Sequence, residues 1–221
     1  MMINVKDSFT TQDRWPLKIT KLAAGESRAF DATAGTYYVM LQNASYVSDT
    51  VRFESVNGAF AVNGDFTIMA GTGTAAVVEY PGLHLLESRY YVQDQLGMGN
   101  LSYIDGGTNT TAVNPGRLGD PVINYVHFPA GMYQTLHTHP SHRVGMILRG
   151  HGQIELDNQQ LFEVRQGEVF FMQRNVLHNF QCPFDQDVVL FVFAPDSGTG
   201  PTDEVNPLKI RTYIGQQRYT R

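Results

Sequence analysis

The C-terminal half of the sequence is a succession of short apolar segments separated by turn residues. Val122–Phe128 ends at a Pro-Ala-Gly turn, Val144–Leu148 ends at Arg-Gly-His-Gly, and residues 187–194 form a near-continuous apolar run. Such a run is typical of a strand that is covered on both faces. The chain also contains 21 Gly, 10 Pro, 13 Phe and 11 Tyr and has few helix-like stretches. We therefore predict an all-β protein whose many short strands form a jelly roll or barrel.

The overall composition limits the kinds of partner that we expect. The 221 residues suffice for one large or two small domains, and 42% of them are hydrophobic. A net charge of −5 argues against nucleic-acid binding. The N-terminal residues contain no apolar signal-peptide core, and no apolar run has the length of a membrane span. We therefore expect a cytoplasmic protein without membrane contact, in which the single cysteine, Cys182, is a small buried apolar residue.

Three histidines form a candidate metal site. His137 and His139 are two positions apart in a strand-like segment, so their side chains point to the same face. His178 lies in a second apolar segment, and from a neighbouring strand it would complete a facial set of three nitrogens. Such a set suits one divalent metal ion, such as Fe, Zn, Mn or Ni, and leaves positions open for water or substrate. The alternative is a barrel that keeps these histidines as hydrogen-bonded core residues.

Glycines stand at fixed distances from these histidines. The first set reads Gly131, His137, His139 and Gly150, and the second reads Gly167 and His178. This arrangement resembles the two motifs of the cupin superfamily, G-x5-H-x-H-x3,4-E-x6-G and G-x5-P-x-G-x2-H-x3-N, over about residues 121–195. The resemblance implies a double-stranded β-helix barrel with a metal ion on His137, His139 and His178.

The sequence departs from both motifs at defined positions. Arg143 occupies the position of the glutamate ligand, so the three-His-plus-Glu metal shell of the family cannot form. Gln173, Asn175 and Cys182 replace the Pro, Gly and Asn of the second motif. We expect Asn175 to supply the left-handed backbone conformation that the family obtains from Gly.

Arg143 has two alternative placements. Its guanidinium cannot ligate a metal and stays charged. The side chain either turns out of the barrel to a carboxylate such as Glu163 or Glu168, or faces a cavity in which an anion bridges it and the metal. The adjacent His142 should face the opposite side, as a surface or turn residue. The histidines that match no motif position are expected to be structural: His84, His127 and His151.

The N-terminal half carries a weaker copy of the same pattern. Residues 60–69 parallel residues 162–172, which places Ala75 opposite His178, and residues 37–41 parallel residues 143–148. We interpret residues 15–92 as a degenerate cupin lobe that keeps a barrel but lacks the ligands, which would make the chain a bicupin. An unrelated β-sandwich is the alternative.

The sequence is accordingly divided into three parts. Residues 1–92 form the degenerate cupin-like lobe, residues 93–120 form an interlobe linker or brace, and residues 121–221 form the cupin domain with a C-terminal tail. In the linker, Leu101–Asp105 is expected to pack against one lobe. In the tail, Leu208–Ile214 is predicted to add an edge strand, and the nearby cations are predicted to be solvated: Lys209, Arg211, Arg218 and Arg221.

The resemblance implies a mononuclear three-His small-molecule enzyme, either an oxygenase with non-haem Fe(II) or an isomerase or lyase. A non-catalytic protein that binds a sugar or an organic acid is the second hypothesis, and an assembly scaffold is the third, because this fold hosts many chemistries. Tyr133, Gln134 and Glu168 are near the histidines in sequence, but none can be named as a general acid or base. We expect a small-molecule ligand, anionic if Arg143 faces the cavity, and a homodimer as the candidate assembly.

Overall fold

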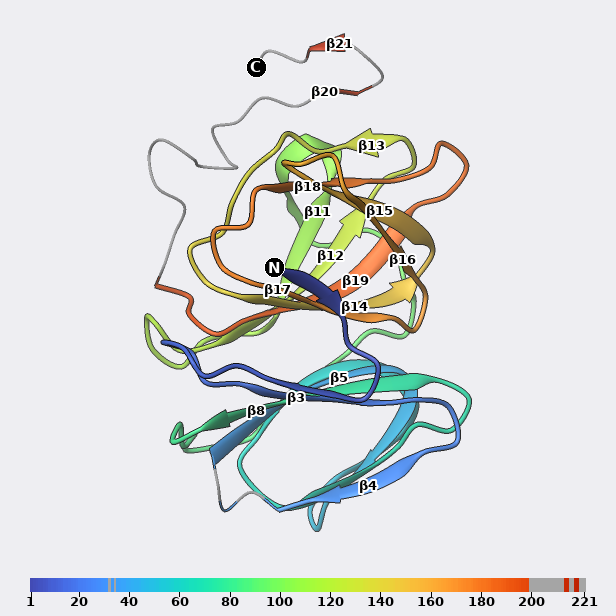
Figure 1. Cartoon of the computed structure of the whole chain (residues 1–221). Helices are drawn as coiled ribbons and strands as arrows, with labels where there is room; N and C mark the ends of the chain where they lie inside the picture. The colour runs from blue at the N-terminus through green and yellow to red at the C-terminus, as the bar shows by residue number, and fades with distance from the viewer. Residues whose placement is uncertain (32, 34, 199–212, 215–216, 219–221) are drawn as a thin grey trace.

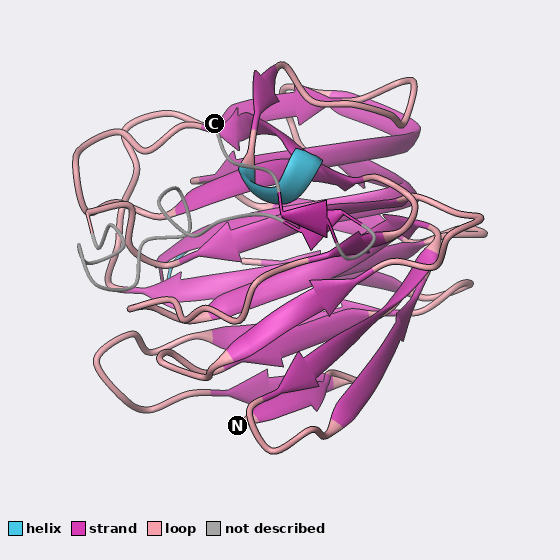
Figure 2. Cartoon of the chain, turned by 90° about the horizontal axis from the view of Figure 1, so that it is seen from above, coloured by secondary structure: helices cyan, strands magenta, loops and turns pink. Residues whose placement is uncertain are grey.

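Strands make up nearly all of the regular structure of the protein. The computed structural model describes residues 1–31, 33 and 35–198, with residue 104 as backbone only, and the backbone of residues 213–214 and 217–218. Within this part of the chain the other regular elements are short 3₁₀ turns, among them η2 (Ile104–Gly106), which is cyan in Figure 2. The all-β prediction is confirmed. No helix in these described residues is long and apolar enough to cross a membrane.

The C-terminal half folds into a barrel made of two antiparallel sheets (Figure 1). One sheet has the strand order β1-β17-β14-β19-β12-β11-β10, and the other has the order β16-β15-β18-β13-β20-β21. The strands of the first sheet are β1 (Met2–Asn4), β10 (Leu101–Ser102), β11 (Thr108–Val113), β12 (Val122–Phe128), β14 (Arg143–Arg149), β17 (Val169–Met172) and β19 (Val188–Ala194). The strands of the second sheet are β13 (Met132–Tyr133), β15 (His151–Leu156), β16 (Leu161–Arg165), β18 (His178–Gln181), β20 (Tyr213–Ile214) and β21 (Gln217–Arg218).

The N-terminal half forms a second β lobe, which lies below the first in Figure 1. Its strands are β2 (Ser8–Thr10), β3 (Lys18–Leu22), β4 (Ser27–Phe30), β5 (Gly35–Val47), β6 (Arg52–Val62), β7 (Phe66–Met69), β8 (Thr74–Pro81) and β9 (Arg89–Val92). The strand order is β2-β3-β8-β5-β6-β9, and β7 pairs with both β4 and β5. The long strand β5 pairs with β8 through its first part and with β7 through its last part. The chain is thus built as jelly-roll barrels, as predicted.

The two lobes pack against each other through the outer faces of two sheets. Along β19, Val188 and Leu190 point into the C-terminal barrel, whereas the alternate residues Val189, Phe191 and Phe193 point toward the N-terminal lobe. There Phe193 meets the ring of Tyr38 on β5, with ring centroids 5.0 Å apart. Full burial of such a side chain contributes about 1.5–3 kcal/mol to stability. The near-continuous apolar run is therefore a strand covered on both faces, as predicted.

Segments outside residues 121–221 complete the first sheet of the C-terminal barrel. Strand β1, at the N-terminus of the chain, pairs with β17 so that Met2 lies opposite Met172 and is buried in the barrel core. In Figure 1 the N-terminus accordingly lies beside β17. From the linker, β10 and β11 extend the same sheet beyond β12. The expected boundaries at residues 92 and 120 stay a prediction.

The pairing of strands in the N-terminal lobe repeats that of the C-terminal barrel. β3 pairs with β8 as β12 pairs with β19, and β4 pairs with β7 as β13 pairs with β18. The first part of β5 corresponds to β14: it pairs with β8 and with the end of β6, as β14 pairs with β19 and β17. The last part of β5 corresponds to β15: it pairs with β7, as β15 pairs with β18. The match of residues 37–41 with the strand that begins at Arg143 agrees with this pairing.

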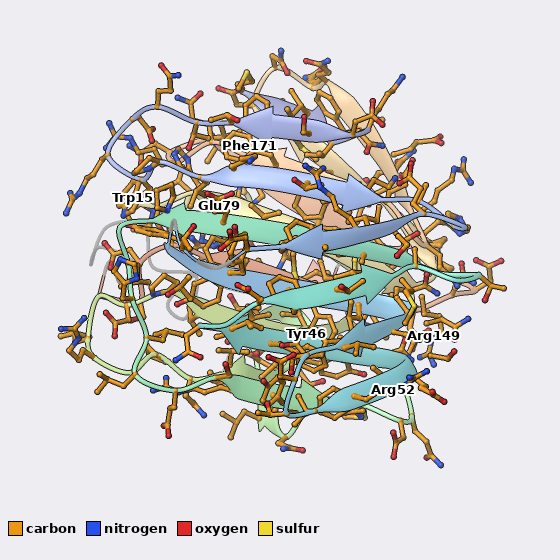
Figure 3. The ribbon with its side chains drawn as sticks, turned by 90° about the horizontal axis from the view of Figure 1, so that it is seen from below. Trp15, Tyr46, Arg52, Glu79, Arg149 and Phe171 are labelled. Carbon is orange, nitrogen blue, oxygen red and sulfur yellow. The ribbon has the colours of Figure 1, made fainter. Side chains whose placement is uncertain are left out.

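The second part of the sequence alignment between the lobes is wrong. Residues 66–69 form β7, the counterpart of β18, and not a counterpart of β17. The residue that corresponds to His178 is therefore Phe66, whereas Ala75 lies on β8, the counterpart of β19. The position of the site is filled by aromatic rings, because Phe66 stacks on Phe30 and on Tyr46 (labelled in Figure 3).

Part of the predicted tail lies outside the described residues. Residues 208–212 and the cations Lys209, Arg211 and Arg221 belong to that undescribed stretch, and only the backbone of Arg218 is described. The backbone of β20 pairs with β13, with Met132 opposite Ile214.

Candidate metal and ligand site

The three predicted ligands come together at one end of the C-terminal barrel. His137 pairs with His178, the first residue of β18, through two backbone hydrogen bonds of 2.9 and 3.0 Å. His139 follows two positions later, and its ring centroid lies 4.9 Å from that of His137 and 5.1 Å from that of His178. One ring nitrogen of each residue lies within 4.8 Å of the others. One ion could touch all three nitrogens after small side-chain rotations.

Backbone carbonyl groups set the orientation of two of these rings. The Nδ1 atom of His137 lies 2.8 Å from the carbonyl oxygen of Thr135, and that of His178 lies 2.8 Å from the carbonyl oxygen of Val176. A carbonyl oxygen only accepts, so both Nδ1 atoms carry the proton and both Nε2 atoms keep a free lone pair. This is the arrangement that metal-ligating histidines require.

Burial keeps the three imidazoles neutral. It lowers the pKa of His137, and it lowers the pKa of His139 well below its usual value, with a further contribution from the nearby positive charge of Arg143. Burial also lowers the pKa of His178 to about 3. Neutral imidazole is the form that binds a metal. The chemistry of the donor set therefore fits a divalent ion.

The histidines line a cavity of about 230 Å³ inside the barrel. Most of its wall is apolar: Val126, Phe128, Pro140, Ile154, Phe170, Met172, Phe180, Leu190 and Val192. The polar remainder is Tyr103, Asn109, Asn124, Gln134, Arg143 and the three histidines. Among the described residues, no Asp or Glu lines the cavity, so its one permanent charge is the cation of Arg143.

Gly145 shapes one side of this cavity. A Cβ atom at Gly145 would lie 2.1 Å from the ring of Phe170. The tip of the Phe170 ring can therefore occupy the space over residue 145 only because that residue has no side chain.

Arg143 faces the cavity. Its Nη1 atom donates hydrogen bonds to the carbonyl oxygen of Ser141 (3.1 Å), to Ser141 Oγ (2.8 Å) and to the carbonyl oxygen of His142 (2.8 Å). These bonds engage one nitrogen, so the Nε and Nη2 edge of the guanidinium has no hydrogen-bond partner among the described residues. Burial lowers the pKa of Arg143 to about 10, and the group stays charged at neutral pH.

Of the two placements considered for Arg143, the one in which it turns outward to Glu163 or Glu168 is wrong. Glu163 pairs with Arg165, and Glu168 accepts hydrogen bonds from Asn4 and from the backbone of Arg165. The reason is the alternation of β14. Val144 points into the interlobe core, so Arg143 points into the barrel.

His142 is not a surface residue, contrary to expectation. It is 1% exposed, and its Nε2 atom lies 2.9 Å from Asp13 Oδ1. The rings of Trp15 and Phe171, both labelled in Figure 3, pack against its imidazole. The N-terminal segment covers this side of the loop, which no local pattern around residue 142 reveals.

The remaining predicted positions have structural surroundings. His127 pairs with Asp187 at 3.1 Å, and His151 contacts Gln186 at 2.6 Å. Cys182 is buried in the barrel core, as predicted. Asn175 adopts the predicted left-handed conformation (φ 59°), and its N–H donates to the carbonyl oxygen of His139 at 2.8 Å, which ties the second motif to the first.

Of the residues near the histidines in sequence, one lines the cavity. Gln134 is buried, and its Oε1 atom accepts a hydrogen bond of 3.2 Å from the N–H of Phe180. Tyr133 is 48% exposed and donates to Glu155 on the outside of the sheet. Glu168 is half-buried and is not among the residues that line the cavity.

Two site residues were missed because they come from the linker. Tyr103 lines the cavity near Arg143, and burial raises the pKa of its hydroxyl. Asp105 is 3% exposed, has a left-handed backbone (φ 61°), and accepts a hydrogen bond from the N–H of Thr135, two residues before His137. A strained backbone of this kind is often found at functional sites. No sequence motif marks either residue.

The comparison with known proteins agrees with this geometry. Residues 124–194 match a family model described as the cupin domain. A search of curated proteins found no match to the chain.

Several solved structures share the fold at low identity. One is a cupin 2 conserved barrel domain protein from Leptotrichia buccalis (13% identity, TM-score 0.56, 89% of each chain covered). An IolB-like protein from Salmonella typhimurium LT2 is similar over 92% of this chain and 90% of its own (14% identity, TM-score 0.58). Salicylate 1,2-dioxygenase from Pseudoaminobacter salicylatoxidans, solved with gentisate, is similar over 81% of this chain and 68% of its own (12% identity, TM-score 0.54). Residues 124–194 thus match a cupin domain, and the whole chain shares its fold with these solved structures.

Proposed function

We propose that the protein is a mononuclear metal-binding cupin that takes a small carboxylic acid with an apolar body into its C-terminal barrel. His137, His139 and His178 would hold the ion, and Arg143 would hold the carboxylate. The observation that carries this proposal is that the guanidinium of Arg143 and the three imidazoles line one cavity.

The metal part of the proposal rests on the donor set. Three neutral imidazoles present nitrogen atoms to one point, and the backbone fixes two of the rings. When bound, the ion would supply Lewis-acid or one-electron redox chemistry at the positions that the histidines leave open. Fe, Zn, Mn and Ni all suit such a set.

The ligand part rests on the remainder of the cavity wall. The Nε and Nη2 edge of Arg143 can donate two parallel hydrogen bonds to a carboxylate. The walls beside it are mostly aromatic and aliphatic, which suits a ring-sized apolar body better than a sugar with many hydroxyl groups. The absence of Asp and Glu from the described lining disfavours a cationic ligand. The similar salicylate 1,2-dioxygenase, solved with gentisate, is in keeping with this class.

Among enzymatic reactions, the cavity favours an oxygenase over an isomerase or lyase. Proton abstraction needs a base within hydrogen-bond reach of the substrate. Tyr103 is the titratable side chain in the described lining besides Arg143 and the histidines, and its raised pKa makes it a poor base. The same lack of acid–base groups supports the second candidate, a non-catalytic binder of an organic acid.

The N-terminal lobe would be a second cupin-type barrel that lost its site. Its strand pairing follows that of the C-terminal barrel, and Phe30 and Phe66 take the places of His137 and His178. We propose that this lobe contributes to stability rather than to metal chemistry. A homodimer and a cytoplasmic location also remain proposals.

The test is metal analysis followed by ligand binding. We expect untagged protein, purified from cells, to carry about one metal ion per chain. Benzoate should bind to the metal-loaded protein and should fail to bind to Arg143→Met at the same concentration. Turnover of a ring carboxylate with O₂ consumption would identify an oxygenase, and binding without turnover would identify the non-catalytic alternative. Metal-free protein that cannot be loaded would refute the metal site.

A further inference from the structure

We propose that Asp13, in the connection between β2 and β3, is a positioning residue for Arg143 and thereby for the carboxylate of the ligand. This inference rests on the proposed function. Asp13 is 129 positions from His142 in the sequence, yet the two side chains are 2.9 Å apart. The link runs from Asp13 through His142 to the acceptors that hold Arg143.

The hydrogen bonds of His142 define the state of its ring. The N–H of Arg174 points to His142 Nδ1 at 3.0 Å, so Nδ1 accepts and carries no proton. Nε2 therefore carries the proton and donates to Asp13 Oδ1. The imidazole is fixed at both nitrogens and packed by Trp15 and Phe171. A ring held in this way cannot rotate without breaking a buried hydrogen bond.

The backbone of the same loop holds the guanidinium of Arg143. All three hydrogen bonds of Nη1 go to Ser141 and His142, both of which are fully buried. The loop also carries His139, which lies three residues before His142. A shift of His142 would therefore move the acceptors of Arg143, and with them the free Nε and Nη2 edge that faces the cavity.

Asp13 is itself part of a defined turn. Its Oδ1 atom also accepts a hydrogen bond from the N–H of Trp15 at 3.2 Å. Thr11 supports the same turn independently, because its Oγ1 atom donates to the carbonyl oxygen of Trp15 (2.7 Å) and accepts from the N–H of Leu17 (2.8 Å). Trp15 is 4% exposed, so the turn is anchored next to His142. The chain therefore offers variants that separate the turn from the contact with His142.

Three variants distinguish the role of Asp13 in the turn from its contact with His142. Asp13→Asn keeps an oxygen that can accept from both Trp15 and His142. Asp13→Ser keeps an acceptor for the turn, since a Ser hydroxyl can replace Asp there, but is too short to reach His142. Thr11→Val loosens the same turn and leaves the contact between Asp13 and His142 in place.

The experiment compares benzoate affinity with metal content in the Zn(II)-loaded proteins. In Asp13→Ser we expect benzoate to bind about tenfold more weakly while the Zn(II) content stays at the wild-type level, since loss of about one hydrogen bond to a charged group weakens binding by about tenfold or more. Asp13→Asn should restore the affinity, and Thr11→Val should keep it. Wild-type affinity in Asp13→Ser would overturn the proposal. So would a loss in Thr11→Val as large as that in Asp13→Ser.

A second readout does not depend on the ligand. The Nε–H resonance of Arg143 in NMR spectra of the metal-free protein should shift in Asp13→Ser and stay in place in Asp13→Asn and Thr11→Val. If wild-type protein fails to bind benzoate, the proposed ligand class is wrong, and this resonance still decides the role of Asp13. An unshifted resonance in Asp13→Ser would show that Asp13 does not position Arg143.

Discussion

Phe66 faces Phe30 across two paired strands of the N-terminal lobe, as His178 faces His137 in the C-terminal barrel. The two Phe rings stack with centroids 4.9 Å apart and planes 12° apart, and the two His rings have centroids 4.4 Å apart. The same place in the fold thus holds an aromatic core in one lobe and a donor set in the other. Substitutions in the aromatic core, in the donor set and in the cavity wall can test this difference.

Phe66→Ala should destabilise the protein without changing its metal content. Removing a buried ring that packs against Phe30, Tyr37 and Tyr46 should lower the free energy of unfolding by about 3–5 kcal/mol. Chemical denaturation measures the loss, and elemental analysis measures the metal. A fall in metal content at wild-type stability would show that this lobe holds a cation.

His137→Ala and His178→Ala should each lose most of the bound metal. Each removes one of three donors, and two histidines alone hold a divalent ion weakly. His151→Ala is the matched control, because His151 lies on the exposed surface and contacts Gln186 outside the cavity. Stoichiometry is measured by elemental analysis. Unchanged metal in both site variants would refute the assignment.

Arg143→Glu should strengthen metal binding and weaken carboxylate binding. The carboxylate would supply the glutamate ligand type of the cupin motif, so metal should bind more tightly. Benzoate affinity should fall by about tenfold or more, since each charge-assisted hydrogen bond is worth about 1.5–3 kcal/mol. Arg143→Met separates the two effects, because it removes the cation without adding a ligand. Equal metal and benzoate affinities in wild type and Arg143→Glu would mean that Arg143 has no role in either.

Gly145→Ala should close the cavity. The new Cβ atom would displace the ring of Phe170, which lines the pocket, at a cost of about 1–3 kcal/mol in stability. Benzoate binding should weaken and metal content should stay the same. Gly64→Ala is the control, since a Cβ there meets nothing within 4 Å. Wild-type benzoate affinity in Gly145→Ala would place the ligand elsewhere.

Cys182 should be unreactive in the folded protein. Burial raises the pKa of its thiol to about 12, so at pH 8 only about one molecule in 10,000 carries the reactive thiolate. Alkylation by iodoacetamide should therefore be slow in native protein, rise about tenfold per pH unit up to the pKa, and become fast in denaturant. Mass spectrometry follows the reaction. Rapid alkylation of native protein at pH 8 would contradict the burial of this residue.

Local patterns predicted the parts of the fold that depend on local geometry. Alternation placed His137 and His139 on one face, and the position of Asn175 in its turn indicated a left-handed residue. The double burial of β19 also followed from its apolar run. Each of these properties is determined within a few residues of the chain.

The second part of the alignment between the two lobes failed because their strands are interrupted differently. In the C-terminal barrel, Gly150 separates β14 from β15, and Gly167 lies between β16 and β17. In the N-terminal lobe, β5 and β6 run through the corresponding points as continuous strands, with Asn43 and Ser55 at positive φ in place of glycine. Gly64 therefore does not correspond to Gly167, and counting from these two glycines shifts the register.

Contacts between distant segments were beyond the reach of sequence patterns. The pairing of β1 with β17, the contact of Asp13 with His142, and the delivery of Tyr103 and Asp105 from the linker all join segments that are far apart in the chain. Hydrophobic periodicity shows that a face is buried, but it does not identify the segment that covers it.

The apolar layer between the lobes has a consequence for the way the protein unfolds. Val189, Phe191 and Phe193 of the C-terminal barrel are buried in one apolar cluster with Tyr38 and Met40 of the N-terminal lobe. Separation of the lobes would expose this apolar surface to water, so we expect the two lobes to unfold together. The stability of the N-terminal lobe, which lacks the histidine triad, would then limit the temperature up to which the histidine site of the C-terminal barrel stays folded.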